Sequence, residues 1–149
     1  MAEGVRIYRA PMRARNLDVP PGAGAEYGLT LGVVGIDPGR GEKAARMLHR
    51  FATVPSGVFV WTRDRAGDYH LGRIAGAARE DRSPAALAVG ILHVRDTTWL
   101  PRAFQETEVP SAVAQTFARG GRNFQRTHDS KAERITAEIW LRERRTGQA

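Results

Sequence analysis

The chain has 149 residues, of which 42% are apolar, so it is long enough for one hydrophobic core and too apolar for an intrinsically disordered protein. It has no run of about 18 apolar residues and its N-terminus lacks the apolar stretch of a signal peptide, so we expect a cytoplasmic protein with no membrane partner. The absence of cysteine excludes disulfides and thiolate zinc sites.

The charge of the chain favours nucleic acid as its partner. The net charge is +7, from 23 Lys and Arg against 16 Asp and Glu, and lysine occurs only at Lys43 and Lys131. The excess is therefore nearly all arginine, whose planar guanidinium suits phosphates and base edges. An interaction protein whose basic face meets an acidic partner is the alternative.

Local patterns predict short strands and helices along the chain. Alternating apolar and polar residues mark strands, a 3.6-residue period marks helices, and glycine and proline mark loops. The expected elements, in chain order, are a strand at residues 5–10, a long loop at 15–28, a strand at 29–36, a helix at 42–51, a β-hairpin at 57–81 with its turn at 64–68, a strand at 87–95, a helix at 109–118, a loop or short strand at 120–129 and a helix at 130–144. The capping box Ser130-x-x-Glu133 opens the last helix.

This order of elements indicates an α+β protein. We expect a small curved antiparallel sheet or open β-barrel with about three peripheral helices. Residues 1–149 are expected to form a single domain, in which residues 107–149 are a C-terminal helical and basic extension packed on the barrel.

The segment GVVGIDPGRGEKAARM, residues 32–47, joins a strand to a helix through a glycine-rich loop that holds Asp37. A phosphate-binding loop needs lysine beside its last glycine and a hydroxyl after it, whereas Gly41 is followed by Glu42, Lys43 and Ala44. The run LGVVGIDPG also resembles the first-strand motif of RuvC-type junction resolvases, in which the aspartate binds a catalytic metal. Two-metal chemistry needs several converging carboxylates, which this chain does not offer in sequence. A metal-dependent nuclease that uses Asp37 remains an alternative.

Other catalytic and metal-binding patterns are missing from the sequence. The histidines His49, His70, His93 and His128 are scattered, and no serine lies in a nucleophile-elbow context. We therefore expect no enzymatic activity, no metal and no cofactor.

A family resemblance lies in the stretches GDYHLGRIAGAARED, residues 67–81, and GILHVRDTTWL, residues 90–100. An aromatic before Leu-Gly-Arg-Ile-x-Gly, followed by a strand with His-Val-Arg that closes with Trp-Leu, resembles PUA-like domains of the EVE and YTH type. Similar patterns occur in modules of bacterial modification-dependent restriction systems. The resemblance spans about residues 5–100 and includes LTLGVVGIDPG with the helix after it.

The resemblance implies that the chain reads nucleic acid, because this family often flips one base into a pocket walled by aromatic residues. Such a pocket needs stacking surfaces, groups for the base edge and a basic rim. The residues implied for this base pocket are Tyr27, Asp37, Ser56, Trp61, Thr62, Tyr69 and Trp99. Asp37 would accept a hydrogen bond from an exocyclic amine, and Thr62 or Ser56 would complete the base edge.

The chain departs from the family at two aromatic positions. The tryptophan that often follows the glycine strand has no counterpart in GIDPG, and AARED replaces the usual aromatic after the Arg-Ile-x-Gly turn. Core packing is the competing role for Trp61, which has valines beside it on the hairpin, and for Trp99 and Trp140.

The segment FARGGRNFQRTHD, residues 117–129, concentrates arginine and amide side chains around a Gly-Gly pair. Glycine lets the backbone approach a ligand closely, and Arg, Asn and Gln pair with base edges. Phe124 suits either stacking on a base or anchoring the segment in the core. The residues predicted to contact the nucleic-acid backbone are Arg63, Arg119, Gly120, Gly121, Arg122, Asn123, Gln125 and Arg126. A solvated surface loop is the alternative for this segment.

The sequence thus leads to one functional hypothesis. We expect a PUA-like module that binds nucleic acid without catalysis, with DNA that carries a methylated base favoured as the ligand. A separate nuclease or effector protein is a possible partner, and an RNA reader is the alternative.

Overall fold

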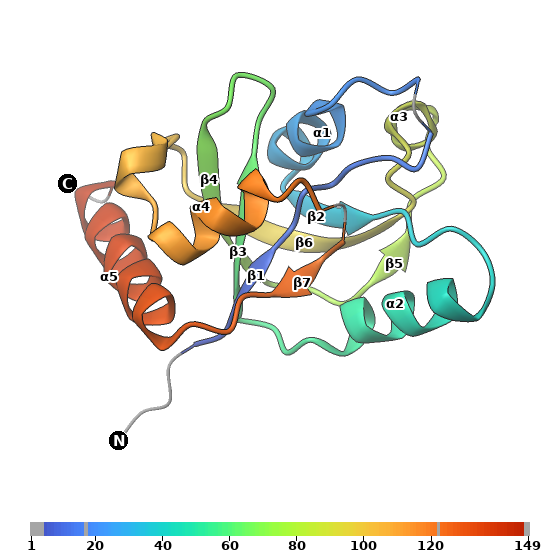
Figure 1. Cartoon of the computed structure of the whole chain (residues 1–149). Coiled ribbons are helices and arrows are strands. Elements are labelled where there is room, and N and C mark those ends of the chain that lie inside the picture. The colour runs from blue at the N-terminus through green and yellow to red at the C-terminus, as the bar shows by residue number, and fades with distance from the viewer. Residues whose placement is uncertain (1–4, 17, 122, 148–149) are drawn as a thin grey trace.

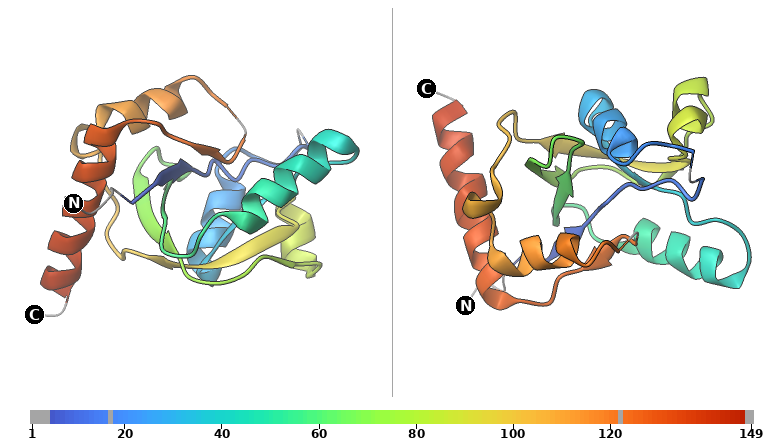
Figure 2. Two further views of the ribbon diagram at one scale, coloured as in Figure 1. Left: turned by 90° about the horizontal axis from the view of Figure 1, so that it is seen from below. Right: turned by 45° about the horizontal axis from the view of Figure 1, so that its top comes forward.

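The computed structural model describes residues 5–16, 18–121 and 123–147. Its elements, in chain order, are β1 (Ile7–Arg9), α1 (Ala23–Leu31), β2 (Val33–Ile36), α2 (Glu42–Thr53), β3 (Phe59–Arg63), β4 (Tyr69–Ile74), β5 (Arg79–Glu80), α3 (Pro84–Val89), β6 (His93–Trp99), the 3-10 helix η1 (Glu106–Glu108), α4 (Ser111–Ala118), β7 (Gln125–Arg126) and α5 (Ser130–Gly147). Helices α4 and α5 lie together on one side of the sheet, and α1, α2 and α3 lie on the other (Figures 1 and 2).

Within the described residues, seven strands form one sheet in the order β2-β6-β4-β3-β1-β7, with β5 paired to β6. Strand β6 is shared, because residues 93–96 pair with β2 while residues 97–99 pair with β4. Strands β2 and β4 thus lie on opposite edges of β6, and the curled sheet forms an open half-barrel (Figure 1). All strand pairs are antiparallel except β1 with β3, which is parallel.

The predicted α+β class with a curved open sheet is confirmed. The hairpin of β3 and β4 is present, with Trp61 opposite Leu71 and Thr62 opposite His70. Helices α2, α4 and α5 form close to their predicted positions. The described part of the chain holds five α-helices, because α1 and α3 lie in segments for which the sequence predicted a loop and a strand.

Helix α1 replaces much of the loop predicted at residues 15–28. Its buried face consists of small residues that allow the backbone of neighbouring segments to come close. A Cβ on Gly24 would lie 2.0 Å from the carbonyl oxygen of Met12, and a Cβ on Gly28 would lie 2.6 Å from that of Val33. The glycines that suggested a loop therefore serve close packing of a helix against the chain.

Helix α3 replaces the first part of the strand predicted at residues 87–95. The Ser83 side chain accepts a hydrogen bond from the backbone N–H of Ala86 at 3.1 Å, and Pro84 occupies the first turn. Gly90, with φ of 72°, ends the helix, and the strand then begins at His93.

The start of α5 also differs from the prediction. Helix α5 begins at Ser130, so the capping position belongs to Asp129 rather than to Ser130. Asp129 Oδ1 accepts a hydrogen bond from the backbone N–H of Ala132 at 2.8 Å. Glu133, the other half of the expected capping box, instead pairs with Arg126 at 3.4 Å.

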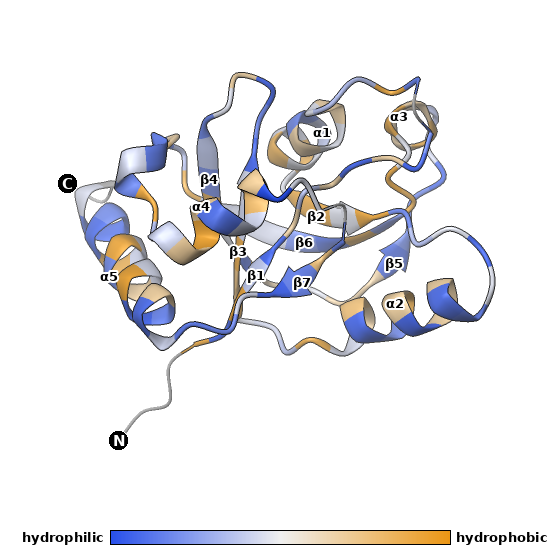
Figure 3. Cartoon of the chain, viewed as in Figure 1, coloured by the Kyte–Doolittle hydropathy of each residue, from blue (hydrophilic) through white to orange (hydrophobic). Residues whose placement is uncertain are grey.

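The buried side chains form two clusters. The first cluster, around Val34, Phe51 and Val60, packs the sheet against α1 and α2. The second cluster, around Trp61, Phe104 and Trp140, packs β1, β3 and β4 against α4 and α5. Along α5, bands of apolar residues recur among polar ones, as expected for a helix with one buried face (Figure 3).

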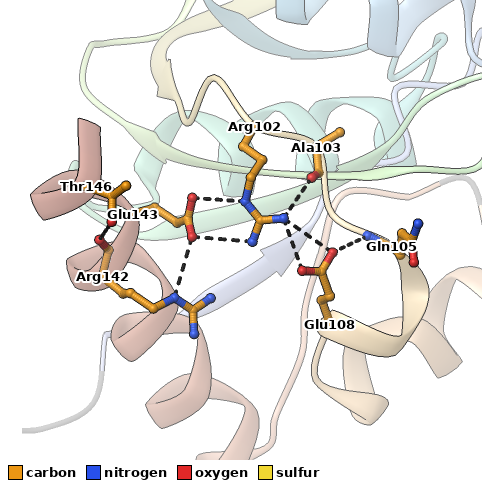
Figure 4. A network of polar contacts seen from close by, with 7 residues as sticks. All are labelled: Arg102, Ala103, Gln105, Glu108, Arg142, Glu143 and Thr146. Carbon is orange, nitrogen blue, oxygen red and sulfur yellow. Dashed lines mark hydrogen bonds and ion pairs between the residues drawn. The ribbon is translucent and has the colours of Figure 1, made fainter.

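Arg102 fastens η1 to α5 at the edge of the second cluster. Its guanidinium contacts Glu143 of α5 at 3.0 Å and Glu108 of η1 at 3.1 Å (Figure 4). The same guanidinium lies over the Phe104 ring, 4.1 Å from the ring centroid. Arg102 lowers the pKa of the Glu143 carboxyl through its hydrogen bond to that carboxyl.

Among the described residues, no helix has the length and apolar character needed to cross a membrane.

Candidate nucleic-acid interface

A cavity of about 210 Å³ lies where the segment after β1, the end of β2, α2 and the segment before β7 meet. We call it the Asp37 cavity. Its apolar lining includes Met12, Ile36, Met47 and Phe124, and its polar lining consists of Arg13, Arg15, Asp37 and Asn123. The cavity is smaller than the roughly 300–1,000 Å³ of pockets for drug-sized ligands, so its size suits one small flat ring system.

Strand β2 and the turn after it place Asp37 at the edge of this cavity. A Cβ on Gly35 would lie 2.2 Å from Ile91 Cγ2, so only glycine fits there. Asp37 Oδ1 accepts a hydrogen bond from the backbone N–H of Gly39 at 3.1 Å, which turns the chain toward α2. Gly39 has φ of +78°, and a Cβ there would lie 2.6 Å from Arg15 Nε. The turn therefore packs against the Arg15 guanidinium. Asp37 and Arg15 thus both line the cavity.

Phe124 forms a fixed aromatic wall. Its side chain is almost fully buried, and its ring stacks on Tyr8 with the centroids 4.8 Å apart. The ring of Phe51 meets it edge-on at 5.2 Å. Contacts on two sides restrict the Phe124 ring, so a ligand in the cavity would meet a preformed apolar surface.

The polar groups of the Asp37 cavity can pair with the edge of a heterocycle. A carboxylate accepts hydrogen bonds, and the Asn123 side chain both donates and accepts them. Aspartate accepts from an exocyclic amine, and asparagine pairs with the edge of adenine. An apolar wall, one carboxylate, one amide and two arginines thus combine the features that recognise a base and the phosphates attached to it.

The next residues of the same segment line a second cavity, of about 230 Å³, which we call the Arg9 cavity. Its lining residues include Arg9, Thr116, Arg119, Gln125, Arg126 and His128. Arg9 Nε donates a hydrogen bond to the carbonyl oxygen of Asn123 at 3.2 Å, so the two cavities are linked through Asn123.

Of the residues predicted for the base pocket, Asp37 alone lines the Asp37 cavity. Trp61 and Tyr69 are fully buried, so no face of either ring is open to a base. Trp61 Nε1 donates to Thr136 Oγ1 at 3.1 Å, and the Tyr69 hydroxyl donates to Glu106 at 3.2 Å. Both rings belong to the second core cluster, the competing role that the sequence suggested for Trp61.

The other predicted pocket residues also lie outside the lining of the Asp37 cavity. Trp99 is half-buried, and its Nε1 donates to the carbonyl oxygen of Val33 at 3.2 Å. Ser56 accepts a hydrogen bond from Arg95 at 3.4 Å. Thr62 is fully buried in β3.

Tyr27 lies on α1 and points to the segment that precedes α3. Its hydroxyl donates a hydrogen bond to Asp81. Burial first, and this hydrogen bond second, raise the pKa of Tyr27 above its ordinary value. Tyr27 therefore joins α1 to the region of Asp81 rather than walling the Asp37 cavity.

Some of the residues predicted for backbone contact line the two cavities, and others do not. Asn123 lines the Asp37 cavity, whereas Arg119, Gln125 and Arg126 line the Arg9 cavity. Gly120 and Gly121 connect α4 to this segment, and Arg122 lies outside the described residues. Arg63 is exposed on the hairpin, where its guanidinium stacks over the Tyr69 ring at 5.3 Å.

The cavities also contain residues that the sequence reasoning missed. Met12, Met47, Arg13 and Arg15 line the Asp37 cavity. The run RAPMRAR, which leaves a strand and enters an irregular segment, was the signal for these arginines. Arg9 lies in the same run but inside β1, so its alternation with apolar neighbours suggested only a strand.

The nuclease alternative requires acidic neighbours for Asp37. Among the described residues, no three His, Asp or Glu side chains come together as a metal site. The charged side chains beside Asp37 in its cavity are Arg13 and Arg15.

No protein-family model and no curated protein sequence matches this chain. Solved structures do match. The YTH domain of Zygosaccharomyces rouxii MRB1 protein, solved in complex with N6-methyladenosine RNA, is 14% identical, with a TM-score of 0.50, over 89% of this chain and 83% of that chain. The fold is YTH-like. The protein Atu2648 of Agrobacterium tumefaciens is 10% identical, with a TM-score of 0.41, over 90% of this chain and 92% of that chain.

Proposed function

We propose that the chain is a nucleic-acid-binding reader that takes one modified base into the Asp37 cavity. The observation that carries this proposal is the cavity itself, which is lined by Phe124, Asp37, Asn123, Arg13 and Arg15. The YTH-like fold supports it, because the similar YTH domain was solved with N6-methyladenosine RNA.

A recessed cavity of this size receives a base only after the base has left its stack. Base flipping from a duplex costs a few kcal/mol, and less for a mismatched or single-stranded base. The exposed part of the Phe124 ring would repay some of this cost through apolar contact alone, because one face of the ring is already stacked on Tyr8. Asp37 would accept the hydrogen bond of an exocyclic amine.

A methyl group on the base would contact the apolar lining of Met12, Ile36 and Met47. Burial of one methyl-sized group is worth about 0.8 kcal/mol, which corresponds to roughly fourfold tighter binding. The cavity would therefore prefer a methylated base by a modest factor, and a separate nuclease or effector protein would act on the bound site.

DNA is the nucleic acid that we propose, as the sequence hypothesis did. An RNA reader is the second candidate, because the similar YTH domain was solved with RNA. The basic groups at the two cavities serve either polymer, and the 2′-hydroxyl is the group that would separate them.

A binding panel tests the proposal. We would measure the affinity of the full chain for duplex and single-stranded DNA and for RNA of one sequence, each with and without a methylated adenine or cytosine. The expected result is tighter binding of one methylated strand, by roughly fourfold. Equal affinity for every member of the panel would refute the modified-base proposal.

Asp37→Asn and Asp96→Asn form the variant pair for this panel. Asp37 lies at the cavity, while Asp96 is an exposed aspartate of β6 that pairs with Arg79. Asp37→Asn is expected to reduce the preference for the methylated strand, because the amide offers a weaker acceptor and adds a donor. Asp96→Asn makes the same change of charge and is expected to leave the preference intact. Loss of the preference in both variants would mean that Asp37 has no special part in it.

A further inference from the structure

Arg9 is a buried guanidinium that has no carboxylate partner among the described residues. Its side chain is 8% exposed. It donates to the carbonyl oxygens of Asn123 at 3.2 Å and Thr116 at 3.0 Å and to Gln125 Oε1 at 2.9 Å. These neutral acceptors satisfy hydrogen bonds but leave the charge uncompensated, and a buried charge is normally paired because its desolvation is costly.

The surroundings of Arg9 add further positive charge. Burial first, and the nearby charge of Arg119 second, lower the pKa of Arg9. Arg119 and Arg126 line the same cavity. The Nε of Arg126 is buried and finds no partner within the described part of the chain.

The acidic groups near this cavity are already used. Asp129, which also lines it, caps α5 through a hydrogen bond from the backbone N–H of Ala132 at 2.8 Å. Glu133 pairs with Arg126 Nη2 at 3.4 Å, so it reaches one end of that guanidinium and leaves Nε unpaired.

Arg95 shows what a purely structural buried arginine does in this fold. It is 3% exposed and donates to the carbonyl oxygens of Phe51 and Val54 at 3.1 and 2.6 Å, which closes the end of α2. Arg9 instead lines an open cavity, and the three hydrogen bonds above use three of the five N–H groups of its guanidinium.

Gly121 adapts the chain to Arg9. A Cβ at Gly121 would lie 2.6 Å from Arg9 Nη2, so the segment approaches the guanidinium closely only because this residue is glycine. Gly121, the second residue of the Gly-Gly pair, thus makes room for the Arg9 guanidinium beside the segment between α4 and β7.

We propose that the Arg9 cavity is a phosphate-binding site that holds a backbone phosphate of the same nucleic acid whose base enters the Asp37 cavity. Arg119 and Arg126 would contact the phosphate oxygens, and Arg9 would supply positive charge at the bottom of the cavity. This inference rests on the proposed function. The contact of Arg9 Nε with the Asn123 carbonyl connects the phosphate site to the wall of the Asp37 cavity.

Arg119→Gln tests the site without disturbing the core, because Arg119 is exposed. The matched control is Arg145→Gln, an exposed arginine near the end of α5 that contacts only its own helix among the described residues. Removal of one phosphate contact is expected to weaken oligonucleotide binding by roughly tenfold. It should also reduce the slope of log affinity against log salt by about 1, equally for methylated and unmethylated strands. The control should change neither quantity beyond a small general effect.

Inorganic phosphate supplies a second measurement. Titration of the full chain, followed by two-dimensional NMR, is expected to shift the Arg9 Nε–H signal and the amide signals of Thr127 and His128 in the wild type. The shifts should be lost in Arg119→Gln and kept in Arg145→Gln. A wild type without these shifts, or an Arg119→Gln protein with the wild-type salt slope, would overturn the phosphate site. Equal affinity for methylated and unmethylated strands, together with a reduced slope in Arg119→Gln, would refute the modified-base proposal and leave the phosphate site standing.

Discussion

Two fully buried threonines, Thr62 and Thr136, differ in what their hydroxyls do. Thr136 Oγ1 accepts the hydrogen bond of Trp61 Nε1 at 3.1 Å, whereas Thr62 Oγ1 has no partner within the described residues. A buried polar group without a partner costs about 1–3 kcal/mol, and its replacement by an apolar group of the same shape removes that cost. We therefore expect Thr62→Val to raise the free energy of unfolding by about 1 kcal/mol.

Thr136→Val is the matched comparison. It has the same change of shape but leaves Trp61 Nε1 buried without an acceptor, so it should lower the free energy of unfolding by about 1–2 kcal/mol. Urea unfolding of both variants, read from tryptophan fluorescence, provides the test. A destabilised Thr62→Val protein would mean that the Thr62 hydroxyl has a hydrogen-bond partner inside the fold after all.

At the scale of elements, the turn between β3 and β4 depends on one carboxylate. Asp64 accepts hydrogen bonds from the backbone N–H of Asp68 at 3.0 Å and from His70 Nε2 at 2.8 Å. Burial alone would raise the pKa of Asp64, but the hydrogen bonds from His70 and Asp68 outweigh it, so the pKa is lowered from 3.8. A lowered pKa stabilises the fold above the unfolded-state value, and this stability is lost as the pH falls through the folded-state value.

Asp64→Asn keeps an acceptor for the turn but removes the charge. The wild type should be the more stable protein near neutral pH, and its advantage should shrink as the pH falls below about 4. Urea unfolding of both proteins over that range measures the difference. An advantage that stays constant down to about pH 2.5 would show that ionisation of Asp64 does not stabilise the turn.

Helix α5 provides a second prediction at this scale. Asp129 caps its first turn, while Ser130, which the sequence pattern favoured, lies inside the helix. Asp129→Ala should lower the free energy of unfolding by about 1 kcal/mol, within the 0.5–2 kcal/mol typical of such caps. Ser130→Ala should have almost no effect. If thermal unfolding shows the larger loss for Ser130→Ala, the capping box of the sequence is the true start of the helix.

At the scale of the whole molecule, the sequence predicted what local patterns determine. The hairpin follows from the alternation of apolar and polar residues, and α2 follows from their helical periodicity. Both patterns can be seen in a short stretch of sequence. Helix α1 could not be predicted in this way, because Gly24 and Gly28 favour a helix only through contact with Met12 and Val33. Tertiary contacts also decide the site. The Asp37 cavity joins segments from four parts of the chain, so the sequence indicated Asp37 but not its neighbours Met12 and Met47.

The last prediction concerns the charge of the whole molecule. The two cavities together carry the arginines Arg9, Arg13, Arg15, Arg119 and Arg126. If about four phosphates are neutralised, log affinity for duplex DNA should fall against log salt with a slope of about −3.6, a loss of roughly 150-fold between 50 and 200 mM salt. The double change Arg13→Gln and Arg15→Gln should bring this slope closer to zero by about 2. Fluorescence anisotropy across a salt series measures both slopes, and a wild-type slope near zero would exclude phosphate contacts at these cavities, because counterion release accompanies every such contact.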